Sequence, residues 1–423
     1  MGCPFCKMPP NHPTPQSGFI PELNGLRACA IILVFLLHVR AYIPATHLPG
    51  AILQNYLGLG WAGVDLFFVL SGFLITGILL DTRTATNYFS GFYARRVLRI
   101  FPLYYVVLTA VILTGVFLNS STVSAVLPQP SDRWLYYSYL TNWLNLWKEH
   151  WGRGYTNYLA HFWSLAVEEQ FYFVWPLIVW LIPSRAVPWV AGCLAAFAAL
   201  LRLAWVAHSG AQIAIAISTF TRMDALFIGA LSASLFRNPA LMLRARKWLP
   251  SIAILGIGSF LLAFSALLLS DLQDADALED ATMLLSQSGG YTALAIGFGA
   301  LVLLAAYRSQ ENNWFQAILR SRALESIGTY SYGIYVFHVP LLGAANIYLA
   351  PRLFPDDEPG LWMGLAFIVV FAAVTFIVSA LSYNLFERRI LAYKRFFEPR
   401  IAPPALELMP VDSLTESAES VLS

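Results

Sequence analysis

An arginine and a histidine share one face of the first hydrophobic segment of the chain. Arg27 and His38 are eleven residues apart, which on an α-helix is about three turns and a rise of roughly 16 Å. One side chain would lie near a membrane surface and the other inside an apolar segment. An ionisable group there costs on the order of 2.5 to 3.5 kcal/mol and commonly marks a pathway or a reacting centre. Because an imidazole titrates near neutrality, His38 is suited to take a proton from a hydroxyl group.

The elements that must position these residues are apolar helices. Of the 423 residues, 58% are hydrophobic and only 12% are charged, and the mean hydropathy is +0.62. The apolar residues form runs of roughly 17 to 25, the length that a transmembrane helix needs. We therefore expect an all-α fold, a polytopic bundle of about ten transmembrane helices. The expected spans are 26–45, 58–80, 98–118, 161–182, 187–207, 212–236, 249–270, 289–306, 327–349 and 361–386.

The chain divides into a transmembrane domain and two polar ends. Residues 1–18 form a Pro-rich segment, residues 19–390 the transmembrane domain, and residues 391–423 a largely disordered tail. Cys3 and Cys6 form a lone CxxC pair, which disfavours a zinc or redox site. No cleavable signal peptide is expected, because the first apolar stretch is charged and lacks a small-residue cleavage site.

Loop charges predict the orientation of the bundle. If the N-terminus is cytoplasmic, most loop Lys and Arg residues fall on that side, including the cluster at 237–247. The loop cations on the opposite side are Arg133, Lys148, Arg153 and Arg352, accompanied by the acidic stretch 271–280. Positively charged loops stay in the cytoplasm, so we expect both termini there and the protein in the cell membrane. The net charge of +2 is spread along the chain, which argues against a nucleic-acid partner.

Topology also places polar side chains at matching depths on different spans. Ser164 and Glu168 follow His161 on one helical face, and Tyr335 and His338 share a face of a later span. These groups are expected to converge with His38 in the outer half of the bundle. The full outer set is His38, Asp65, Ser71, His161, Ser164, Glu168, Tyr335 and His338. A purely structural role for a buried His338 remains equally open.

A second set of charges lies nearer the cytoplasmic side. Its members are Arg27, Arg95, Arg96, Arg99, Glu387 and, nearer mid-depth, Arg222 and Asp224. Arg95, Arg96 and Arg99 either anchor a helix at the cytoplasmic surface or bind an anionic cofactor. Arg222 and Asp224 must face the interior, where they either neutralise one another or pair with other buried groups. The aromatic-rich loop 119–160 is either an interfacial belt or a sugar-stacking surface.

Several sequence blocks resemble, in order, those of the acyltransferase 3 family of membrane O-acyltransferases. Leu23-Asn24-Gly25-Leu26-Arg27 followed by His38 is similar to the family's Arg-x10-His signature. The other similar blocks are 63–75, 92–102, 161–172, 331–340 and 382–388. Asn24 departs from the family's usual Asp, which removes a possible charge partner of Arg27, and Arg389 stands where Pro is frequent.

The resemblance implies transfer of an acyl group, with acetyl as the first expectation. The donor would be a cytoplasmic acyl-CoA and the acceptor a hydroxyl of a carbohydrate, glycolipid or secondary metabolite. Arg27 would position the donor, His38 would act as base or transient acyl carrier, and Glu168 would orient an imidazole or the acceptor. The expected donor-binding residues are Arg95, Arg96, Arg99 and Arg222, and the remaining outer set is acceptor-side or supporting. No permanently bound cofactor and no metal are expected.

An alternative is a proton-coupled transporter of a small polar or anionic solute, for which membrane-embedded His, Glu and Asp are also typical. The sequence shows no inverted repeat and no matched pair of broken helices, which disfavours this alternative. Some family members carry a fused extracytoplasmic hydrolase-like domain, whereas this chain ends in a short tail. We therefore expect it to complete the reaction alone or with a separate partner. The acceptor, the acyl length and the oligomeric state stay open.

Overall fold

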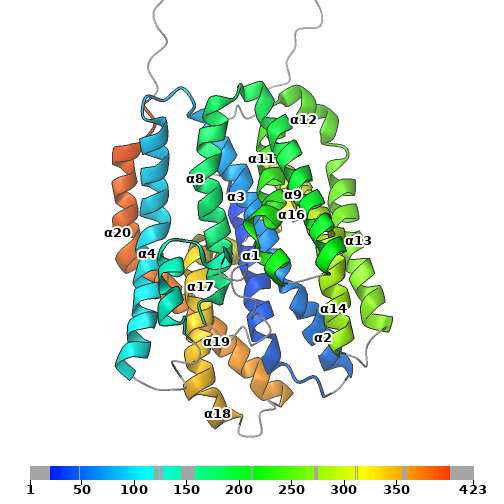
Figure 1. The fold of residues 1–423 in the computed structure, drawn as a ribbon, viewed down its shortest axis with the longest axis vertical. Coiled ribbons are helices and arrows are strands. Elements are labelled where there is room, and N and C mark those ends of the chain that lie inside the picture. Colours follow the sequence, from blue (N-terminus) through cyan, green and yellow to red (C-terminus); the bar gives the residue numbers. More distant parts are fainter. Residues whose placement is uncertain are drawn as a thin grey trace, which may run out of the picture.

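The computed structural model describes residues 20–46, 48–118, 123, 127–143, 158–210, 213–270, 275–309, 311, 313–354 and 360–400. The regular elements in these ranges are helices, arranged as an elongated bundle (Figure 1). The long helices are α1 (Pro21–Val39), α3 (Ala62–Asp81), α4 (Tyr88–Leu118), α8 (Trp163–Leu181), α9 (Val187–Ser209), α11 (Thr219–Phe236), α13 (Leu249–Ser270), α15 (Tyr291–Tyr307), α17 (Arg322–Tyr348) and α19 (Leu361–Ser382). The short helices are α2 (Leu48–Gly58), α6 (Arg133–Tyr137), α10 (Ile213–Ile217), α12 (Pro239–Ala245), α14 (Ala275–Leu285), α16 (Trp314–Leu319), α18 (Ala350–Leu353) and α20 (Arg388–Leu391).

A long helix lies at each expected span. Within the described ranges, eight helical stretches are long and apolar enough to cross a membrane. The helices α8 and α17 are not among these eight, and both carry charged residues, such as Glu168 in α8 and Glu325 in α17. The polytopic helical bundle is therefore confirmed, whereas ten crossings stay a prediction.

Helices α3 and α11 pack in near backbone contact. A Cβ atom at Gly72 would lie 1.9 Å from the carbonyl oxygen of Leu226, and one at Gly229 would lie 2.1 Å from that of Val69. Only glycine allows this approach, as in other small-residue contacts between membrane helices. The contact fixes α3, which carries Ser71, against the second half of the bundle.

Helices α1 and α17 meet at the ends where they begin. The amide nitrogen of Asn24 donates to the Glu325 carbonyl at 3.0 Å and to the Thr329 hydroxyl at 3.2 Å. Glu22 pairs with Arg320 at 2.5 Å at the same end. Asn24, the departure from the family pattern, thus joins two helices, and Arg27 lies one turn further along α1.

The ordered chain extends past residue 391, where the tail was expected to begin. The segment η8 (Tyr383–Glu387) continues α19 into α20, and the 3₁₀ segment η9 (Ala392–Phe397) follows. Figure 1 shows α20 beside α4, although the two are far apart in the sequence. Order continues to Arg400 because the backbone there bonds to the start of α4, as described below. Residues 1–18 with their CxxC pair, the tail beyond Arg400 and, within the loop 119–160, residues 119–122, 124–126 and 144–157 lie outside the described residues.

Candidate active site

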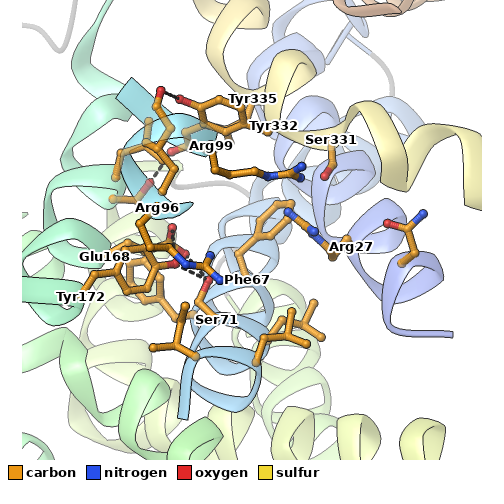
Figure 2. A pocket seen from close by; sticks show the side chains of 18 of the residues that line it. Arg27, Phe67, Ser71, Arg96, Arg99, Glu168, Tyr172, Ser331, Tyr332 and Tyr335 are labelled. Carbon is orange, nitrogen blue, oxygen red and sulfur yellow. Dashed lines mark hydrogen bonds between the residues drawn. The ribbon is translucent and has the colours of Figure 1, made fainter. Parts of the chain in front are cut away.

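A cavity of about 430 Å³ opens between α1, α3, α4, α8 and α17. Figure 2 shows that Arg27 projects into it from α1, whereas Glu168 and Tyr172 of α8 line another part of the wall. Apolar side chains of α3, including Leu70, Leu74 and Ile75, form a further part of the lining. The cavity therefore combines charged groups with an apolar surface, as binding sites for amphipathic ligands do.

Four cations line this cavity: Arg27, Arg96 and Arg99 from the long helices, and Lys394 from η9. In the described part of the chain, none of the four is joined to a carboxylate by an ion pair. The Arg96 guanidinium lies 5.6 Å from the centre of the Tyr172 ring and 5.8 Å from that of Phe92. Like charges gathered in a partly dry space attract a compensating anion.

Glu168 is the one carboxylate among the described residues that line the cavity. The Ser71 hydroxyl donates to its Oε1 at 2.8 Å, and the Tyr172 hydroxyl lies 3.3 Å from its Oε2. Tyr172 also donates to Ser71 Oγ at 3.0 Å. Glu168 and Tyr172 are four residues apart on α8 and so share a face. These bonds hold the carboxylate in one orientation toward the cavity.

Three imidazoles lie next to one another beyond one wall of the cavity. The ring centres of His38 and His338 are 4.8 Å apart, and those of His338 and His161 are 5.1 Å apart, each pair in an edge-to-face arrangement. None of the three lines the cavity. The sequence therefore predicted correctly that these histidines converge, but Glu168 faces the cavity instead of joining them.

Tyr335 and Ser164 form the boundary between the cavity and the imidazoles. Both line the cavity, and their hydroxyl oxygens are 2.5 Å apart. The Tyr335 hydroxyl donates to the carbonyl of His161 at 2.7 Å. The Tyr335 ring also lies 5.3 Å from the ring of His161 and 5.6 Å from that of His338. These two side chains therefore lie between the cavity and the imidazoles of His161 and His338.

Hydrogen bonds define the form of two imidazoles. His38 Nδ1 lies 2.7 Å from the Val34 carbonyl, and His338 Nδ1 lies 2.7 Å from the Tyr335 carbonyl. A carbonyl only accepts, so Nδ1 carries the proton in both neutral rings and Nε2 keeps a free lone pair. This is the form that a general base requires. Within the described ranges, no group of three or more His, Cys, Asp and Glu residues is arranged to hold a metal ion.

Arg222 and Asp65 lie apart from the cavity in a buried ionic cluster. Arg222 donates to Asp65 at 2.7 Å and lies 3.6 Å over the centre of the Tyr291 ring. Arg202 pairs with Asp224 at 2.9 Å, and all four charged side chains are almost fully buried. Of the two interpretations of Arg222 and Asp224, pairing with other buried groups is the one observed. Arg222, expected to bind the donor, and Asp65, expected on the acceptor side, instead neutralise one another.

The positions of four further residues, Arg95, Lys394, Tyr172 and Arg202, were harder to predict from the sequence than the convergence of the histidines. Arg95 donates to the carbonyl of Phe397 and does not line the cavity, unlike Arg96 and Arg99. Lys394 was missed because it lies in the expected tail. Tyr172 was missed as well, although its spacing of four residues from Glu168 was a usable signal. Arg202 gave no signal beyond being a lone cation in an apolar run.

Comparison with known proteins gives matches that cover most of the chain. Residues 20–384 match the sequence profile of a family described as Acyltransferase domain. The putative peptidoglycan O-acetyltransferase YrhL of Bacillus subtilis is 28% identical over 389 residues, which cover 90% of this chain and 56% of that protein. The peptidoglycan O-acetyltransferase OatA of Listeria monocytogenes is 28% identical over 387 residues, 88% of this chain and 56% of that protein. The O-acetyltransferase OatA of Staphylococcus aureus is 27% identical over 349 residues, 80% of this chain and 53% of that protein. The chain thus spans about half the length of the curated relatives it matches. No solved structure matches it.

Proposed function

The chain belongs to the acyltransferase 3 family of membrane O-acyltransferases, and from this premise we propose that it transfers an acetyl group from acetyl-CoA to a carbohydrate hydroxyl. The observation that carries the proposal is a cavity lined by four cations that form no ion pair within the described residues, with Tyr335 and Ser164 between it and three neighbouring imidazoles. The names of the relatives, which are peptidoglycan O-acetyltransferases, support acetyl as the group and a carbohydrate as the acceptor class.

The cationic part of the cavity is the proposed donor site. Coenzyme A carries a 3′-phosphate and a diphosphate, and arginine guanidinium groups bind such oxygens through charge-assisted hydrogen bonds. Arg27, Arg96 and Arg99 are placed to do so because, in the described part of the chain, none of them forms an ion pair with a carboxylate. The less polar pantetheine arm would then lie along Leu70, Leu74 and Ile75 of α3.

His38 is the proposed general base. Its Nε2 accepts the proton of the acceptor hydroxyl while the hydroxyl oxygen attacks the thioester carbonyl carbon. The cations of the cavity stabilise the oxyanion of the tetrahedral intermediate. The C–S bond then breaks, and the imidazolium returns its proton to the leaving thiolate. Tyr335 must first rotate away from Ser164, because both lie between the cavity and the imidazoles.

The same arrangement suggests two entrances. Ten crossings with both termini in the cytoplasm would place Arg27 and the start of α4 near the inner surface. His38, near the other end of α1, would lie toward the outer surface. The donor would enter from the cytoplasm and the acceptor from outside, so the acetyl group would be handed over inside the bundle.

The direct test supplies radiolabelled acetyl-CoA to proteoliposomes that contain the purified protein and a carbohydrate acceptor. We expect labelled ester on the acceptor and free CoA in equal amounts, and neither product in empty liposomes. Movement of an intact solute with no cleavage of acetyl-CoA would instead support the transporter alternative.

A further inference from the structure

Lys394 lines the same cavity as Arg27, Arg96 and Arg99 but comes from a different part of the chain. It lies in η9, beyond residue 384, where the match to the family ends. Its side chain is partly buried, whereas the neighbouring Arg395 is exposed and does not line the cavity. Two adjacent cations of one short segment therefore point into different surroundings.

The segment around Lys394 is fixed to the start of α4 by a set of hydrogen bonds. The Asn87 amide nitrogen donates to the Glu398 carbonyl at 2.8 Å, and the Asn87 amide oxygen accepts from the Arg400 backbone nitrogen at 2.8 Å. The Thr86 backbone nitrogen donates to the Arg400 carbonyl at 3.0 Å, and Arg95 donates to the Phe397 carbonyl. The backbone that follows Lys394 is thus fixed to the start of α4, and this places Lys394 at the cavity.

The position of Lys394 is electrostatically unfavourable without a ligand. It shares one cavity with three arginines and with a single carboxylate, Glu168, among the described lining residues. That carboxylate already accepts a hydrogen bond from Ser71, and the Tyr172 hydroxyl lies 3.3 Å from it. A lysine that served only solubility would extend into solvent, as Arg395 does. An anion with several charges would remove the repulsion among the four cations.

We propose that Lys394 binds a phosphate group of the acyl donor and that residues 392–400 form part of the donor site. This inference rests on the proposed function, because it requires the acyl donor to be a thioester that carries nucleotide phosphates, as acetyl-CoA does. The ammonium group supplies a point charge to one phosphate, while the three arginines contact the others. The donor site is then shared between the family-matched helices and a segment that follows them.

The test measures binding of CoA to the purified full-length protein by calorimetry, for Lys394→Gln and for the matched control Arg395→Gln. We expect Lys394→Gln to weaken CoA binding by about tenfold, the effect of losing one charge-assisted contact, and Arg395→Gln to leave it unchanged. Asn87→Ala, which frees the segment without touching the cavity, should weaken binding in the same direction. Binding of pantetheine, which has no phosphate ester, should be equal in all variants.

The outcomes separate this inference from the proposed function. Equal CoA affinity in Lys394→Gln and the wild type, or an equal loss in Lys394→Gln and Arg395→Gln, would overturn the role of Lys394. An equal loss for pantetheine would also overturn it, because the effect would not depend on phosphate. Absence of CoA binding in the wild type would overturn both proposals. Lys394-dependent CoA binding without acetyl transfer would contradict the proposed function alone.

Discussion

Replacing Arg222 by methionine tests whether this arginine stabilises the fold instead of binding the donor. The change removes a guanidinium that lies 2.7 Å from Asp65 and 3.6 Å from the centre of the Tyr291 ring. Asp65 is fully buried, so its carboxylate loses its charge partner. Breaking a buried ion pair from one side costs about 3 to 5 kcal/mol. We expect the free energy of unfolding to fall by about 4 kcal/mol, with CoA affinity unchanged in the protein that stays folded.

A double-mutant cycle gives the decisive comparison. Asp65→Leu combined with Arg222→Met removes both charges, so the double variant should be more stable than either single variant. We expect a coupling of about 3 kcal/mol between the two positions, measured by reversible unfolding in mixed detergent micelles. Destabilisations that add within about 0.5 kcal/mol would refute the reasoning. A loss of CoA affinity in Arg222→Met would return this arginine to the donor site.

Three further predictions concern the cavity and its two entrances. Arg27→Ala should weaken CoA binding by about tenfold, whereas Arg95→Ala should not, because Arg27 lines the cavity and Arg95 does not. Calorimetry on both variants measures this difference, and equal effects would contradict the prediction. Glu168→Gln should slow acetyl transfer without weakening CoA binding, since a carboxylate has no attraction for phosphates. Steady-state rates and calorimetry measure the two effects, and weaker CoA binding with an unchanged transfer rate would contradict this prediction. Sealed inside-out vesicles should consume external acetyl-CoA, whereas sealed right-side-out vesicles should not; equal consumption would contradict the proposed orientation.

The sequence predicted the helices well because each apolar run is a local signal of a transmembrane span. The convergence of His38, His161 and His338 was also predictable, since depth along each helix follows from topology. These predictions needed only position along a helix axis. They did not require knowledge of which helices are neighbours.

The parts that escaped prediction depend on contacts between distant segments. That Arg222 faces Asp65 follows from the close packing of α3 against α11, which periodicity along one helix does not encode. That Glu168 faces the cavity depends on Ser71 of another helix. Lys394 was assigned to a polar tail, because the hydrogen bonds that order residues 392–400 come from a distant segment, namely Thr86 and Asn87 just before α4 and Arg95 of α4.

The central claim is that His38 is the general base of acetyl transfer, whereas the arginines of the cavity hold the phosphates of the donor. His38→Ala should lower the rate of acetyl transfer by about 100-fold or more, the contribution of a general base. CoA binding and membrane insertion should remain as in the wild type. His208→Ala, at an exposed histidine near the end of α9, is the matched control and should retain full activity. Transfer by His38→Ala within about threefold of the wild-type rate would contradict the account, because a general base contributes far more than that.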